Sequence, residues 1–95
     1  MSAYFIANIR ITDQVEYDRY LAEVDEVFAR FNGQYITVDE NPLVLEGQWD
    51  YSRLVLIRFP DLESLGQWYD SEDYRRIRAH RLQGAACDTV VVQGL

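Results

Sequence analysis

The 95-residue sequence contains no lysine, so all nine of its basic side chains are arginines. This absence excludes Schiff-base chemistry and any lysine general base. Sixteen carboxylates outnumber the arginines and give a formal net charge of −7. Because an acidic surface repels phosphate backbones, we expect no nucleic-acid partner.

Residues that bind metals and cofactors are scarce as well. A single cysteine, Cys87, excludes an intrachain disulfide and a thiol-based metal site. His80 is the only histidine, and the carboxylates lack the spacing of a calcium loop, so we expect no metal site. The five glycines are scattered and form no phosphate-binding loop. With no redox motif either, the sequence predicts no cofactor.

Long hydrophobic runs are also missing. The N-terminal segment MSAYFIANIRIT is interrupted by Asn8 and Arg10 and has no basic region ahead of a long apolar stretch. We therefore expect neither a signal peptide nor a transmembrane helix, which needs about 18 apolar residues or more. No basic amphipathic helix indicates a membrane surface. The expected location is the cytoplasm.

The remaining composition is typical of one globular domain spanning residues 1–95. Hydrophobic residues make up 48% of the chain and charged residues 26%. The apolar share includes seven tyrosines, four phenylalanines and two tryptophans, and such rings suit pocket walls and subunit interfaces as well as cores.

Alternating β-forming residues predict four strands, at 4–11, 34–39, 53–59 and 89–93. Three residues are predicted to cap the N-termini of helices, namely Asp13, Asp61 and Ser71. The first helix is expected to end at Asn32-Gly33 with a left-handed cap, and the last to span residues 72–83.

The resulting order is β-α-β-β-α-β, with the second helix in two pieces. This is the split βαβ arrangement of the α+β class, with four antiparallel strands and the helices on one face of the sheet. The other face would carry apolar residues at alternating positions, among them Ile6, Ile36, Leu54, Leu56 and Val91. Two sheets packed face to face would cover them, so we expect a homodimer.

Several motifs occur together: LEGQWD at 45–50, RLVLIRFPDLE at 53–63, WYDSEDY at 68–74, Arg81, and VVVQG at 90–94. With them the chain resembles the DUF1330 family over residues 4–94. The resemblance implies a ferredoxin-like fold, assembly as a dimeric α/β barrel, and no defined biochemical function. Its pattern is matched at Glu46, Gly47, Trp49, Phe59, Pro60, Tyr69, Ser71, Tyr74 and Arg81. Arg58 departs from that pattern, in which an acidic residue is typical, and this alters any charge pairing inside a pocket.

Arg58 ends an otherwise apolar strand, and alternation places it on the same face as Leu54 and Leu56. A guanidinium there either clamps an anion or forms an ion pair with Asp39 or Glu46. The ion pair is the favoured interpretation, because buried charges usually need a partner.

Arg81 lies on the predicted apolar stripe of the last helix, together with Tyr74 and Ile77. A guanidinium on that stripe must meet a carboxylate, backbone carbonyls or a ligand. Structural and ligand-binding roles are equally supported.

Glu46 is the candidate general acid or base, because it precedes Gly47 and stands near Trp49 in the long connection between two strands. A carboxylate beside an indole in a closed pocket would have a raised pKa and could transfer a proton. The favoured alternative is an ion pair with Arg53 or Arg58 that fixes the connection.

Four aromatic side chains could form a pocket, namely Trp49, Trp68, Tyr69 and Tyr74. Packing in the core or at a dimer interface explains any one ring better, whereas the group as a whole favours a pocket. His80 is predicted on the surface flank of its helix, and Cys87 is predicted to be a small buried residue near the end of the helical region.

Three functions are compatible with these residues. The first is a cofactor-independent enzyme acting on a small anionic or aromatic molecule, an analogy with oxygenases and isomerases that have dimeric barrels. In it, Arg81 and Arg58 would hold the anion and Glu46 would move a proton, while Tyr69 or Tyr74 would orient the substrate. The second is a non-catalytic binder of the same kind of molecule. The third is a structural dimer with internal ion pairs and no cavity. The sequence favours a pocket and does not separate the first two.

Overall fold

A computed structural model describes residues 1–95. Its elements follow one another as β1 (Ala3–Ile11), α1 (Gln14–Phe28), β2 (Gln34–Asp39), β3 (Arg53–Phe59), α2 (Leu62–Tyr69), α3 (Glu72–Gly84) and β4 (Ala85–Gln93). The strands form one antiparallel sheet in the order β2-β3-β1-β4. The predicted α+β class with a four-stranded antiparallel sheet is confirmed.

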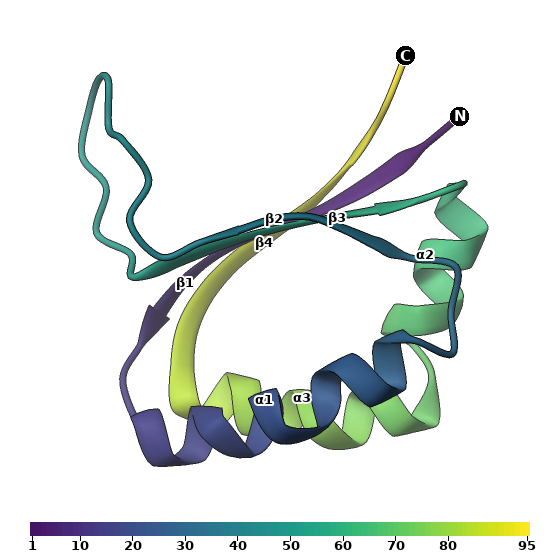
Figure 1. Ribbon diagram of the computed structural model, residues 1–95, viewed down its shortest axis with the longest axis horizontal. Helices are drawn as coiled ribbons and strands as arrows, with labels where there is room; N and C mark the ends of the chain where they lie inside the picture. Colours follow the sequence, from purple (N-terminus) through teal and green to yellow (C-terminus); the bar gives the residue numbers. More distant parts are fainter.

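The helices lie below the sheet in Figure 1, with α1 and α3 side by side and α2 at one end. All three predicted N-caps are confirmed, since Asp13, Asp61 and Ser71 each accept a hydrogen bond from the backbone N–H three residues later. None of the three helices has the length and apolar character needed to cross a membrane.

Two predicted boundaries are wrong. Helix α1 ends at Phe28, and Gly33 has no left-handed backbone, because Gly47 is the only residue with a positive φ. Gly33 instead packs against aromatic rings, and a Cβ there would lie 2.4 Å from the Phe28 ring. Strand β4 begins at Ala85, directly after α3, so Cys87 belongs to a strand and not to the helical region.

The core lies between the helices and the sheet and is richest in aromatic rings around Trp68. This side chain is fully buried, with ring centroids 5.3 Å from Phe5, 5.5 Å from Phe59 and 4.2 Å from Tyr74. The sheet contributes every second residue of two strands to this core. In β1 the odd-numbered residues from Ala3 to Ile9 are buried, and in β3 those from Val55 to Phe59. Large rings of this kind stabilise a small domain by the area that they bury.

The face of the sheet opposite the helices is uncovered. Val90 and Val92 of β4 lie there, opposite Ile6 and Tyr4 of β1, and are 56% and 43% exposed. The prediction for Val91 is wrong in this respect, because Val91 pairs with Phe5 and therefore faces the helix side. The connection 40–52 rises from the sheet on its uncovered side (Figure 1) and exposes further apolar side chains, notably Leu43 and Leu45.

Gly84 holds the junction of α3 and α1 together by close backbone contacts. Its carbonyl accepts hydrogen bonds from the backbone N–H groups of Thr12 and Asp13, and a Cβ there would lie 2.6 Å from the backbone nitrogen of Tyr17. Gly84→Ala should therefore lower the free energy of unfolding by about 1–3 kcal/mol, measured by urea denaturation.

Gly66 provides the matched control, because it lies within α2 and a Cβ there would meet nothing within 4 Å. Gly66→Ala should leave the stability unchanged or raise it by up to about 1 kcal/mol, as alanine favours helix. Equal stability of the two variants would show that the contact at Gly84 does not constrain the fold.

Candidate ligand-binding site

A cavity of about 330 Å³ lies between α1 and the helix-facing side of β1, β2 and β3. Fourteen residues line it, and eleven of them are hydrophobic. The rings around Trp68 fill the interior beside α2 and α3, whereas the small side chain of Ala7 and the uncovered strand β2 leave space above α1. The volume falls at the lower end of the range for small-molecule sites.

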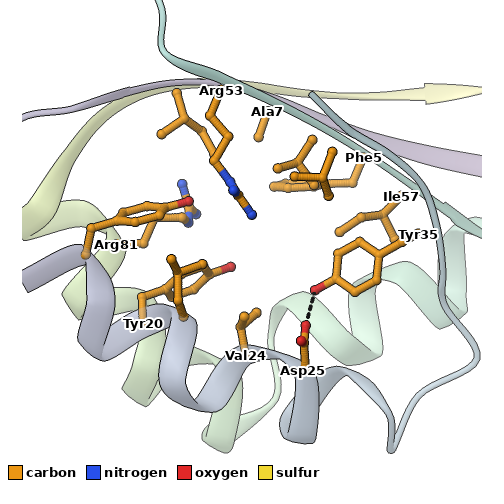
Figure 2. Close-up of a pocket in the computed structure, with 14 residues that line it drawn as sticks. Phe5, Ala7, Tyr20, Val24, Asp25, Tyr35, Arg53, Ile57 and Arg81 are labelled. Carbon is orange, nitrogen blue, oxygen red and sulfur yellow. Dashed lines mark hydrogen bonds between the residues drawn. The ribbon is translucent and has the colours of Figure 1, made fainter. Parts of the chain in front are cut away.

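Arg81 of α3 reaches the cavity wall from the helix side (Figure 2). The residue is only 2% exposed, and its Nε is buried without a hydrogen-bond partner. Arg81 forms no ion pair with any carboxylate, since it is absent from every salt bridge of the chain. A guanidinium buried in this way normally has a partner that compensates its charge.

The neighbours of Arg81 are Tyr20, Tyr74 and Cys87, and none of them is a carboxylate. Burial lowers the pKa of the Arg81 guanidinium, but the Tyr74 and Tyr20 side chains raise it, and the net pKa lies above the ordinary value. The Tyr20 and Tyr74 hydroxyls lie 2.7 Å apart in a buried hydrogen bond. Burial raises the pKa of each, so both stay protonated and uncharged at neutral pH. The groups that favour the charged form of Arg81 are therefore neutral, and no carboxylate pairs with the guanidinium.

Arg53, at the start of β3, is the second arginine of the cavity, and its guanidinium points into the space in Figure 2. Alternation places it on the same side of the sheet as Val55 and Ile57. Its Nη1 lies 3.3 Å from Oε1 of Glu40, and the Arg53 side chain is 16% exposed against 77% for Glu40. Because an exposed carboxylate binds weakly in water, Arg53 is free to exchange Glu40 for another anion.

Asp25 and Tyr35 form the opposite side of the cavity, at its opening between α1 and β2 (Figure 2). The Tyr35 hydroxyl donates a hydrogen bond of 3.0 Å to Oδ1 of Asp25. Burial and then the Asp25 carboxylate raise the pKa of Tyr35, so this hydroxyl keeps its proton. The cavity thus has a cationic end formed by Arg53 and Arg81 and an accepting end formed by Asp25.

Among the residues predicted for the site, Arg81 alone lines this cavity. Tyr74 is fully buried behind it and bonds Tyr20, a lining residue. Tyr69 packs on Phe5 and Trp68, and the Arg78 guanidinium lies 4.4 Å from its ring centre. The structure therefore brings Arg81 and Tyr74 together and leaves Tyr69 partly buried against the core, beside a separate pocket.

The other predicted residues lie elsewhere. Glu46 and Trp49 border a separate shallow hollow of about 300 Å³ on the connection 40–52, where Glu46 is exposed and forms no ion pair. Arg58 lies on the uncovered face of the sheet, and its Nε donates a hydrogen bond of 3.0 Å to Oγ of Ser2. The ion pairs predicted between Arg58 and Asp39 or Glu46, and between Glu46 and Arg53, are absent.

His80 and Cys87 also differ from their predicted surroundings. The His80 Nδ1 lies 2.6 Å from Oε1 of Glu16, so this ring joins α3 to α1 and is partly buried. Cys87 is half-buried on β4 and close enough to Arg81 to affect its pKa. No group of three His, Cys, Asp or Glu side chains is arranged to hold a metal ion.

The sequence interpretation missed Arg53 and Asp25. The signal for Arg53 was its spacing, since it stands two and four residues before the buried Val55 and Ile57. For Asp25 no signal was available, because it stands on α1 next to Val24 and nothing local shows that the helix edge borders a cavity.

Comparison with known families identifies the chain. The model of the family described as "Domain of unknown function (DUF1330)" matches residues 2–95, so the protein belongs to that family. No curated protein matches the sequence.

Solved structures resemble it at low sequence identity. A protein of unknown function from Rhodopseudomonas palustris has a TM-score of 0.81 and 18% identity, over 99% of this chain and 82% of that one. A dimeric ferredoxin-like protein of unknown function from Jannaschia sp. CCS1 has a TM-score of 0.78 and 12% identity, over 99% and 100%. SnoaB, a cofactor-independent oxygenase from Streptomyces nogalater, has a TM-score of 0.70 and 13% identity, over 99% and 93%. At these identities the likeness shows a shared ferredoxin-like fold alone.

Proposed function

We propose that this protein binds a small organic anion in the cavity beside α1, with Arg81 and Arg53 holding the anionic group. The observation that supports the proposal most directly is the charge of Arg81, which is 2% exposed and meets no carboxylate. A buried charge of this kind is costly when unpaired, and an anion from solution would compensate it. The planar guanidinium suits a carboxylate, because it can donate two parallel hydrogen bonds.

The rest of the wall suits an organic body better than an inorganic ion. Most of the lining is hydrophobic, with Phe5, Val24 and Ile57 between the two ends of the cavity (Figure 2). The protonated Tyr17 hydroxyl forms no side-chain hydrogen bond and is available as a donor on the wall, whereas the Tyr20 hydroxyl is engaged with Tyr74. In a ligand with a carboxylate attached to an apolar group, the carboxylate would bind the arginines and the apolar group would contact the hydrophobic wall.

Binding is a better-supported function than proton-transfer catalysis. The tyrosines of the cavity have raised pKa values and are protonated at neutral pH, so they do not act as bases. Asp25 is the one carboxylate on the wall, and a reaction such as oxygenation of an ionisable substrate would need it as the base. The proton-transfer role of Glu46 remains a separate proposal, for a molecule bound beside Trp49.

We further propose that two copies of the chain pack through the uncovered faces of their sheets and form a dimeric α/β barrel. The apolar residues of that face are Ile6, Leu54, Leu56, Val90 and Val92. The connection 40–52, with its exposed Leu43 and Leu45, extends this surface on the same side of the sheet. The dimeric ferredoxin-like protein from Jannaschia has the same fold, which supports a second copy of this chain as the partner that covers the apolar face.

Ligand binding is tested with benzoate and 3-phenylpropionate, using thermal shift and calorimetry. At about 100 times its dissociation constant, a bound acid should stabilise the protein by about 2.7 kcal/mol. Arg81→Gln should weaken binding by about 10- to 100-fold, because a charge-assisted hydrogen bond is lost. Glu40→Gln should tighten binding by about threefold, since Glu40 competes with the ligand for Arg53.

The matched control is Arg75→Gln, which removes a charge from the exposed side of the same helix. It should leave binding unchanged. Failure of both acids to bind the wild type, or equal affinities in wild type and Arg81→Gln, would contradict the proposed function.

The dimer is tested by light scattering of purified protein. Val90→Glu adds a charge to the uncovered face and should convert a dimer to a monomer, because buried charges oppose association. Val15→Glu makes the same change on the exposed side of α1, at a residue that is 69% exposed, and should leave the dimer intact. A monomeric wild type, or a dimer unaffected by Val90→Glu, would rule out this interface.

A further inference from the structure

We propose that the ligand is a single-ring aromatic acid with a hydroxyl or amino group at the end opposite its carboxylate, and that Asp25 accepts a hydrogen bond from this group. The inference rests on the proposed function and specifies the class of molecule. It follows from the two chemically different ends of one cavity, which Figure 2 shows on opposite sides.

Asp25 is placed to select a donor. Only its Oδ1 is engaged, by the Tyr35 hydroxyl at 3.0 Å, and Oδ2 takes part in no hydrogen bond or ion pair. The nearby Arg30, just after the end of α1, pairs instead with Glu26 and Asp73. An ionised carboxylate can only accept, so a ligand group next to the free oxygen must be a donor.

Tyr35 holds the side chain of Asp25 in place and does not itself act as the hydrogen-bonding partner of the ligand. The hydroxyl keeps its proton and directs it to Oδ1, so its hydrogen is unavailable to the ligand. The Phe28 ring packs on Tyr35 with centroids 4.5 Å apart and holds the tyrosine in position. The bond therefore orients the carboxylate at the rim, with its second oxygen open.

The middle of the cavity determines the body of the ligand. The side chains between the two ends are apolar and come from the sheet on one side and from α1 on the other, with Phe5 and Ile57 facing Val24. A flat ring fits between two such layers and contacts both. A volume of about 330 Å³ is small among ligand sites, which favours one ring over a fused system.

The experiment compares two pairs of acids by titration calorimetry. The first pair is benzoate and 4-hydroxybenzoate, and the second is 3-phenylpropionate and 3-(4-hydroxyphenyl)propionate, which spans a greater length. In the wild type, the hydroxylated member of at least one pair should bind about tenfold more tightly, as a hydrogen bond to a charged group predicts.

Asp25→Asn should reduce this preference to less than about twofold while leaving the affinity for the unsubstituted acid unchanged. Glu26→Gln is the matched control, because it removes the same charge from the next residue of α1, which does not line the cavity. It should leave the preference intact. Tyr35→Phe should also keep most of the preference, since Asp25 remains as the acceptor.

Three outcomes are distinguishable. A hydroxyl preference that disappears in Asp25→Asn but persists in Glu26→Gln supports the inference. Equal affinities within both pairs, with binding that still depends on Arg81, overturn the inference and leave the proposed anion binding standing. Absence of binding by all four acids overturns both.

Discussion

The burial of Arg81 without a carboxylate partner is the constraint on which the cavity of this molecule depends. Tyr74 and Ile77 fix α3 against the core, and this orientation also buries Arg81 one turn later on the same stripe. The hydroxyls around it are neutral at physiological pH and supply dipoles without negative charge. A chain with sixteen carboxylates pairs none of them with this guanidinium, and its Nε is buried without a hydrogen-bond partner.

The interior is divided into a filled half and a hollow half. Trp68 of α2 and the rings around it pack closely between the sheet and α3. Beside α1 the sheet presents Ala7 and the edge strand β2, and the hydrogen bond between Tyr35 and Asp25 lies at the rim of the space. A closely packed half thus supports a cavity whose two ends differ in charge.

Local patterns were sufficient for the order of elements. The caps at Asp13, Asp61 and Ser71 and the alternation in β1 and β3 depend on nearest neighbours in the chain, and these predictions are confirmed. Gly33 and the start of β4 were mispredicted because tertiary contacts determine them.

The residues of the candidate site were harder to predict from the sequence than the order of the elements. The burial of Arg81 followed from helical spacing, and that of Arg53 could have followed from its place two residues before Val55. Glu46 and Arg58 drew attention through their neighbours in sequence, yet the fold places them on a connection and on the far face of the sheet. The cavity forms where a helix and the strands are held apart by packing elsewhere in the molecule. No local sequence pattern encodes such an arrangement.

The most direct measurement of the central claim is the stability of Arg81→Met in a buffer free of carboxylate, phosphate and sulfate. If the guanidinium is buried without a counter-ion, an apolar side chain of similar length should raise the free energy of unfolding in urea by about 1–4 kcal/mol. The same substitution at the exposed Arg75 should change it by less than about 0.5 kcal/mol. A loss of stability in Arg81→Met would mean that the guanidinium is already satisfied by its neighbours, and would contradict the account.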